Sequence, residues 1–301
     1  MPDIRVLLLA LITGLAALFL WRWWAAVDRH DGARLRPAPL HVAIGFVVAF
    51  LDTLGIGSLA TTTAVFRALR VVPDERLPAT IIVGLTLTVV AQALIFIARI
   101  AIDPVLLALM IAMALAGGWV GAGIVSRLPR RPIQAGMGVG LLLAALFMAA
   151  AQLQRMPVGG TALSLAGAPL WIALGANFAF GALIMIGIGN YGPTFVLLSA
   201  LGMDPRAAFP IMMGSGAIAA LLGCLAFVRR RAQVDQPALG LALGGVPGVL
   251  VAALLVTGLP IGLLRWLVIG VVTYSALTML RAATQGAGTA DKPVSAAPPR
   301  S

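Results

Sequence analysis

The sequence predicts an all-α polytopic membrane protein built as an inverted repeat. Each repeat is a helical hairpin plus three transmembrane helices, and an extra N-terminal transmembrane helix precedes them. Three observations predict this class. Of 301 residues, 61% are hydrophobic and 10% are charged, whereas soluble domains carry about 25% charged residues. The apolar residues form runs of roughly 20 residues without the alternation of barrel strands, so they indicate membrane-spanning helices. The segment 54–84 also recurs, degenerate but in register, at 186–216.

The apolar runs lie at about 4–24, 40–69, 77–98, 104–126, 132–153, 169–201, 207–228, 235–257 and 261–280. The first run is a poor signal peptide, because it is too long and carries Trp21, Trp23 and Trp24 where small residues should precede a cleavage site. We therefore expect a retained helix whose tryptophans lie at the membrane interface.

Two of the runs are interrupted by Gly-x-Gly. The run 40–69 breaks at 52–58 and the run 169–201 breaks at 187–193. Each half of the first is about 13 residues, or roughly 20 Å of helix, which is short of a 30 Å hydrocarbon core. We expect each broken run to return to the face it entered from, whether it stops midway or crosses twice on tilted helices.

Basic residues test this topology. If every run crossed once, Arg-rich loops would lie on both faces. If the two broken runs are hairpins, one face holds 16 of the 21 basic residues and the other holds 5. The basic face is then cytoplasmic. The expected location is a bacterial-type inner (plasma) membrane, with the N-terminus outside and the C-terminus in the cytoplasm.

The resulting division is an N-terminal helix and cytoplasmic linker (1–39), repeat one (40–152), an external linker (153–168), repeat two (169–283) and a disordered cytoplasmic tail (284–301). Later parts of the repeats agree loosely, since Gly117, Gly118 and Gly121 resemble Gly244, Gly245 and Gly248. Paired Gly-interrupted segments in two inverted halves are the best sequence indicator of a transporter's central site.

Several function classes are disfavoured. The net charge of +11 comes mostly from arginines in short loops, which is the pattern of membrane topology and not of nucleic-acid binding. The only cysteine is Cys224 and the only lysine is Lys292, so a disulfide within the chain and a Walker A loop are both absent. Without His/Glu clusters, a Gly-x-Ser-x-Gly elbow or paired intramembrane acids, we expect no enzyme, no cofactor and no metal.

The Gly-x-Gly breaks carry the candidate substrate site. A helix broken within the membrane exposes N–H groups and a partial positive charge at the start of its second half, which suits an anion. We expect the second halves to start at Ser58 and near Thr194. The candidate substrate-binding residues are Gly55, Gly57, Ser58, Thr61, Thr62, Gly187, Gly189, Asn190, Tyr191 and Thr194. The alternative is helix packing through glycine, with Ser/Thr hydroxyls bonded inside their own helix.

Asp52 is the one acidic residue inside an apolar run, and an acid at the membrane centre costs about 2.5–3.5 kcal/mol on insertion scales. Two roles stay open: a proton-coupling group, or a cap on the second half-helix. Its counterpart in repeat two is Ile184. Gln92 and Asn177 also lie within apolar runs, as linings of the site or as interhelical hydrogen bonds.

The chain resembles the TauE/SafE family of sulfite and organosulfonate exporters. The resemblance rests on GFVVAFLDTLGIGSLATTTAVF and PATIIVGLTLTVVAQALIF between residues 41 and 96, and on GIGNYGPTFVLLSALGMDPRAAFPIMMGSG in the second half. It covers about 40–282 and implies a secondary carrier of small anions, often sulfur oxyanions or sulfonates. The chain departs from the commoner Gly-Ile-Gly-Gly-Gly pattern at Ser58, Leu59, Asn190 and Tyr191.

The expected function is therefore a secondary transporter (permease or exporter) of a small anion, bound between the two Gly-rich hairpin tips. An anion-selective pore and a non-transporting subunit of a larger complex are the alternatives. The expected partners are the lipid bilayer and the anionic substrate, with no nucleic acid, and a homodimer is compatible with the sequence.

Overall fold

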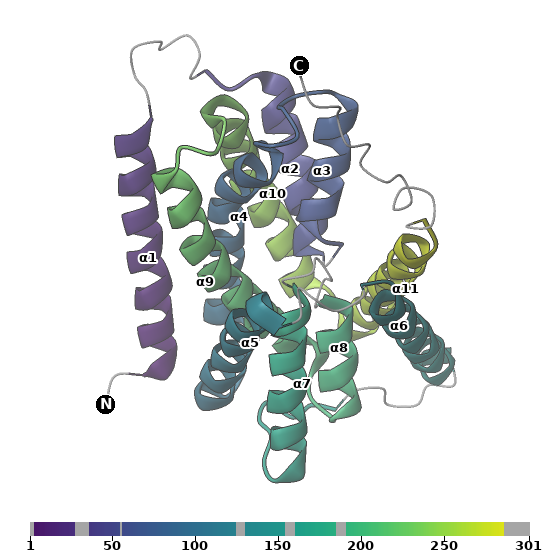
Figure 1. Ribbon diagram of the computed structural model, residues 1–301. Coiled ribbons are helices and arrows are strands. Elements are labelled where there is room, and N and C mark those ends of the chain that lie inside the picture. The colour runs from purple at the N-terminus through teal and green to yellow at the C-terminus, as the bar shows by residue number, and fades with distance from the viewer. Residues whose placement is uncertain are drawn as a thin grey trace.

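A computed structural model describes residues 3–27, 36–54, 56–124, 130–153, 160–184 and 191–285. Within these ranges every regular element is a helix, apart from one isolated bridge between Ala162 and Met203 (Figure 1). The helices are α1 (Ile4–Ala26), α2 (Pro39–Thr53), α3 (Ser58–Ala68), α4 (Leu77–Arg99), α5 (Pro104–Ile124), α6 (Arg130–Leu153), α7 (Ala168–Ile184), α8 (Tyr191–Ala200), a 3-10 turn (Pro205–Ala207), α9 (Ala208–Arg229), α10 (Asp235–Gly258) and α11 (Ile261–Gln285). Among the described residues, 6 helices are long and apolar enough to span a membrane. The predicted all-α polytopic class is confirmed.

Both broken runs form pairs of short helices. The first splits into α2, of 15 residues, and α3, of 11 residues. The second splits into α7, of 17 residues, and α8, of 10 residues, and residues 185–190 between them lie outside the described ranges. At 1.5 Å per residue, none of these four helices spans 30 Å. In Figure 1 the α2/α3 pair fills the upper half of the ribbon and the α7/α8 pair the lower half.

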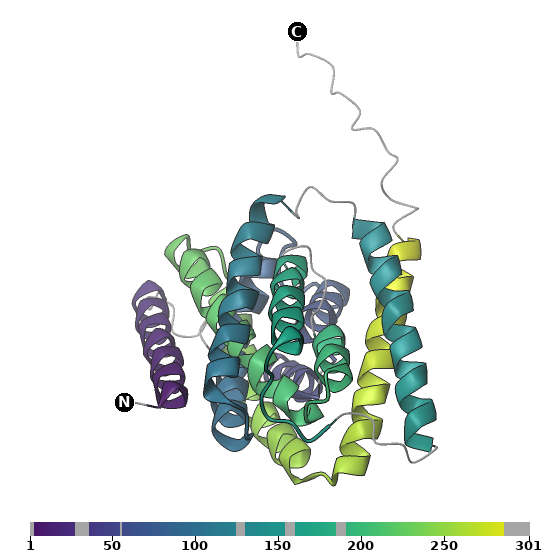
Figure 2. The ribbon, with the colours of Figure 1, turned by 90° about the horizontal axis from the view of Figure 1, so that it is seen from below.

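Close backbone contacts join each hairpin to a long helix of the other half. α2 packs along α10, and α7 packs along α5. A Cβ at Gly244 would lie 1.8 Å from the Val42 carbonyl oxygen, and one at Gly117 would lie 1.9 Å from the Phe178 carbonyl oxygen. Only glycine permits such an approach. The remaining long helices pair α4 with α9 and α6 with α11, and Figure 2 shows α6 and α11 side by side.

The core draws on most of the helices, and three of its aromatic rings join α4 and α8 to α9. The Phe96 and Phe209 rings stack at 4.9 Å between centroids, and Phe195 meets Phe209 edge-on at 5.1 Å. All three rings are fully buried. Aromatic burial of this kind therefore joins the two halves of the chain into one body.

The two ends of the bundle differ in charge. At one end Val234 N–H donates to the Thr80 hydroxyl, and the Gln236 side chain donates to the Arg36 carbonyl. The described arginines in the loops at this end are Arg36, Arg70, Arg76, Arg230 and Arg231. At the other end Asp103 N–H donates to the Leu163 carbonyl, and the Arg206 guanidinium donates to the Leu259 carbonyl. The 101–103 and 160–167 loops there carry no basic residue, and Arg206 is the one arginine in the described connection from α8 to α9.

The N-terminal helix α1 packs on α9, α4 and α5. Trp21 and Trp24 are exposed, in keeping with an interfacial position. Trp23 is different: it is 3% exposed, and its indole N–H donates to the Asp235 carboxylate at 2.9 Å. Trp23 therefore faces the protein and not lipid, because its side of α1 turns toward α9 and the start of α10.

Candidate functional site

The predicted site residues are only partly within the described chain. Gly55, Gly187, Gly189 and Asn190 lie outside the described residues, as does the side chain of Tyr191. The remaining candidates are described, and they are Asp52, Gly57, Ser58, Thr61, Thr62, Gln92, Asn177 and Thr194. The geometry below rests on these.

The break in the first hairpin is a tight turn. Ile56 N–H donates to the Leu51 carbonyl, which ends α2. Gly57 precedes α3 with φ 83° and ψ 126°, a conformation that side chains with a Cβ avoid. No atom lies within 4 Å of the position a Cβ would take there. The start of α3 at Ser58 is as predicted, and it opens onto free space beside Gly57.

Asp52 lies in a buried polar cluster at this turn. The Gln92 amide N–H₂ of α4 donates to the Asp52 carboxylate at 3.0 Å and to the Thr53 hydroxyl at 2.9 Å. Ser58, the first residue of α3, interacts with the same carboxylate through its hydroxyl and its backbone N–H. Asp52 is 2% exposed, and Thr53 and Gln92 are fully buried. The carboxylate therefore lies at the positive end of α3.

The threonines of the two hairpins differ. Thr61 donates to the Gly57 carbonyl at 2.9 Å, and Thr62 donates to the Ser58 carbonyl at 2.8 Å. These are the intrahelical bonds of the alternative reading, although each oxygen keeps lone pairs as an acceptor. Thr194, the counterpart of Thr62, is fully buried, and its hydroxyl has no hydrogen-bond partner among the described residues. Buried polar groups without a partner are unusual and suggest a missing ligand or water.

Both hairpins approach the same turn of α11. Leu54 and Ile56 at the first break line a cavity of about 210 Å³ together with Leu267, Gly270, Val271 and Tyr274 of α11. In the second hairpin, a Cβ at Gly192 would lie 3.3 Å from the Ser275 Cβ. Tyr274 and Ser275 are adjacent residues. The first break and the start of α8 therefore contact neighbouring positions on one helix.

Gln92 and Asn177 both make interhelical hydrogen bonds. Gln92 joins α4 to α2, as described, and the Asn177 side chain of α7 donates to the Met110 carbonyl of α5. Asn177 is 1% exposed. Both residues thus hold a hairpin against a long helix. Gln92 also contacts the candidate site through Asp52.

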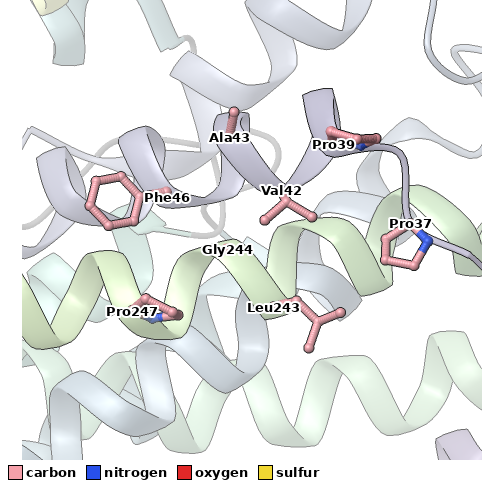
Figure 3. Close-up of a pocket in the computed structure, with 8 residues that line it drawn as sticks. All are labelled: Pro37, Pro39, Val42, Ala43, Phe46, Leu243, Gly244 and Pro247. Carbon is pink, nitrogen blue, oxygen red and sulfur yellow. The ribbon is translucent and has the colours of Figure 1, made fainter.

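A larger groove of about 600 Å³ runs between α2 and α10 (Figure 3). All eight residues that line it are apolar: Pro37, Pro39, Val42, Ala43, Phe46, Leu243, Gly244 and Pro247. Small-ligand sites need a few polar groups to orient the ligand. The groove offers no polar side chain and lies beside Val42 and Phe46, away from the break, so it is not the candidate site.

Sequence reasoning missed Thr53, Tyr274 and Ser275. A weak signal existed for Tyr274, because the chain has only 2 tyrosines and the other, Tyr191, begins α8. Nothing local marked Ser275, whose contact with Gly192 depends on how α8 packs on α11. In the described part of the chain, no group of three His, Cys, Asp or Glu side chains could hold a metal ion.

Comparison with known proteins gives one match. The family model of the sulfite exporter TauE/SafE matches residues 2–148. No curated protein and no solved structure matches the chain. The matched stretch includes α1, which sequence reasoning placed outside the region of resemblance. TauE/SafE is a transporter family, which indicates a membrane transporter. The predicted resemblance to the TauE/SafE family is therefore confirmed over residues 2–148, where the family model matches the chain; the match does not extend to the second half.

Proposed function

We propose that the protein is a secondary transporter of a small anion, which binds between the tips of the α2/α3 and α7/α8 hairpins near the bilayer midplane. The observation that carries the proposal is the approach of both broken helices to the same turn of α11. Broken helices at membrane depth are tolerated where they line a cavity or are buried in protein. Their half-helix N-termini supply N–H donors and partial positive charge for an anion.

Paired contacts support an inverted repeat. Three contacts of α2 with α10 have counterparts between α7 and α5. The contact of Phe46 with Gly248 matches that of Phe178 with Gly117. The contact of Gly45 with Leu241 matches that of Asn177 with Met110, and the contact of Ala49 with Gly245 matches that of Gly181 with Ala114. In each case the hairpin residues are 132 positions apart and the long-helix residues are 131 positions apart. The contacts thus pair Gly117 with Gly248, one helical turn from the pairing with Gly244 suggested by sequence.

The pairing suggests how the carrier moves. Inverted repeats around a central site alternate by rocking of one repeat against the other. The Arg-rich end of the bundle is the cytoplasmic end by the positive-inside rule, which puts the start of α1 outside and the end of α11 inside. The contacts of α2 with α10 and of α7 with α5 join the two repeats, so these contacts would change when the carrier alternates between its outward-open and inward-open states.

Family and cavity together indicate the substrate class. The family transports sulfur compounds, which indicates a sulfur oxyanion or a sulfonate. The cavity at the first break is lined mostly by apolar side chains, with Tyr274 as its one polar side chain. Apolar walls beside N–H donors suit an anion with a short organic group. Within the class, we therefore favour small sulfonates over sulfite.

The test is transport by the purified chain in liposomes. We expect saturable uptake of radiolabelled methanesulfonate that is accelerated by unlabelled methanesulfonate on the opposite side. In detergent, substrate at 100 times its Kd should stabilise the fold by about 2.7 kcal/mol. Single-channel conductance without acceleration from the opposite side would instead establish a pore. Absence of flux and of stabilisation with sulfite, sulfate, sulfonates and carboxylates would favour a non-transporting subunit.

A further inference from the structure

The two hairpin breaks are not equally free to receive an anion. At the first break the Asp52 carboxylate already lies at the start of α3, where it interacts with the Ser58 hydroxyl and backbone N–H. At the second break the matched position is Ile184, which has no charge. The Ser58 N–H and hydroxyl, which would bind a substrate anion at the start of α3, therefore already face an anion of the protein itself.

No cation compensates this carboxylate within the described chain. The elements packed against α2 are α10, α3 and α4. Their charged residues lie at helix ends: Arg67 is exposed and paired with Asp74, Arg99 is exposed, and Asp235 is bonded to Trp23. His41, on α2 itself, lies roughly 16 Å away along the helix. Tyr274 is the titratable side chain that lines the cavity at this break.

A vacant acceptor lies beside the carboxylate. Both N–H bonds of the Gln92 amide are used, one to Asp52 and one to Thr53, while its carbonyl oxygen Oε1 is buried without a partner. Rotation of the amide would bring that oxygen to a protonated Asp52, and the same rotation withdraws the Gln92 N–H groups from Asp52 and Thr53. The unpaired Gln92 Oε1 atom is thus an acceptor available to a protonated Asp52. This evidence is independent of the helix N-terminus at Ser58.

We propose that Asp52 is a tethered competitor of the substrate, so that the anion binds at the start of α3 only when Asp52 carries a proton. On protonation the carboxyl becomes neutral and donates its O–H to the Gln92 Oε1 atom. This releases the Ser58 N–H and hydroxyl to the substrate anion. One proton and one anion then occupy the first hairpin together, which makes the carrier a proton–anion symporter. The inference rests on the proposed function and specifies its coupling ion.

The proposal predicts the direction in which anion affinity changes with pH. If the anion requires protonated Asp52, its affinity falls about tenfold for each pH unit above the range in which Asp52 loses its proton. Below that range the affinity is independent of pH. Replacement of Asp52 by Asn removes the competing charge permanently, so the variant should bind the anion at all pH values with the affinity that the wild type shows in acid.

The experiment measures the Kd of methanesulfonate for the full chain in detergent from about pH 5 to about pH 8, where a sulfonate keeps a fixed charge. The chains compared are the wild type, Asp52→Asn, and Asp74→Asn as a matched control at an exposed carboxylate. We expect a pH-dependent Kd for the wild type and Asp74→Asn, and a flat, tight Kd for Asp52→Asn. Parallel pH profiles in all three would overturn the inference and leave the proposed function intact. No binding by any of them, with sulfite and taurine as well, would overturn both.

A second measurement does not depend on the variant's folding. Addition of methanesulfonate to the wild type in weakly buffered solution should cause uptake of about one proton for each anion bound. No proton uptake would contradict the proposal. The same titration with choline in place of Na⁺ should give an unchanged Kd, and a requirement for Na⁺ would identify the cluster as a sodium site and overturn the assignment to a proton.

Discussion

The α2/α3 and α7/α8 hairpins have similar helix lengths and equivalent packing partners but differ in the polar side chains near their breaks. Each consists of two helices too short to cross the membrane, and each packs its first helix on a long helix of the other half. At the first break a carboxylate, an amide and a hydroxyl form a bonded cluster. The described start of the second hairpin's α8 holds Thr194, whose buried hydroxyl has no partner. The two hairpins therefore carry different polar side chains on similar helix pairs.

The largest expected effect concerns what the hairpins share. Gly248→Val and Gly117→Val each place side-chain atoms against a backbone carbonyl, that of Phe46 or Phe178, which cannot move without its helix. Overpacking costs about 1–3 kcal/mol, and a backbone clash lies at the upper end of that range or beyond it. We expect little monodisperse protein and a large loss of thermal stability for both variants, measured by size-exclusion chromatography and thermal melting.

The matched control for these variants is Gly140→Ala in α6, where no atom lies within 4 Å of the added Cβ. It should keep or slightly raise the melting temperature, because alanine favours helix over glycine. If only one of Gly248→Val and Gly117→Val were harmful, the two hairpins would not be held by equivalent contacts.

The second effect separates the polar anchors of the hairpins. Gln92→Leu removes two hydrogen bonds and leaves the buried Asp52 carboxylate with fewer partners. Hydrogen bonds to charged groups contribute about 1.5–3 kcal/mol, and neutral ones about 0.5–1.5 kcal/mol. Gln92→Leu should therefore destabilise the protein by about 2 kcal/mol and Asn177→Leu by about 1 kcal/mol, as measured by thermal melting in detergent. Equal losses would show that the Asp52 cluster contributes no more than an ordinary interhelical bond.

A smaller effect probes the turn before α3. Gly57→Ala forces a Cβ into φ 83° and ψ 126°, at a site with space for the methyl group. The expected loss is about 1–3 kcal/mol of backbone strain without a steric clash. Gly57→Asn should be no better, because this conformation lies outside the left-handed helical region that Asn accepts. A fully stable Gly57→Ala would indicate that the turn can relax to another conformation.

The smallest stability effect tests the unpaired hydroxyl of the second hairpin. Thr194→Val replaces a buried hydroxyl without a partner by a methyl group, so stability should stay unchanged or rise by about 1 kcal/mol. Transport should nevertheless fall if this hydroxyl binds the substrate. Thr62→Val is the matched variant, and it should lose the stability of its bond to the Ser58 carbonyl. Normal transport by Thr194→Val would remove Thr194 from the site.

Much of the fold was predictable because it depends on local properties. Apolar runs of sufficient length must be helices in lipid, and Gly57 marks a turn that the sequence could place to the residue, since α3 begins at Ser58 as predicted. For the second half-helix, predicted to start near Thr194, the first described residue of α8 is Tyr191, and residues 185–190 before it lie outside the described ranges. The burial of Trp23 could not be predicted, because the sequence shows a cluster of tryptophans but not which one faces the protein.

The sequence by itself determined that this chain is a multi-span helical membrane protein with two interrupted helices and one buried acid. These follow from hydropathy, chain length and glycine spacing, which act over a few turns of helix. Only the tertiary structure decided the partners: Gln92 for Asp52 across 40 residues of sequence, and neighbouring positions of α11 for both hairpins. The physical reason is that such contacts depend on how distant helices pack, and in lipid that packing is set by the close fit of small residues and by scattered polar bonds.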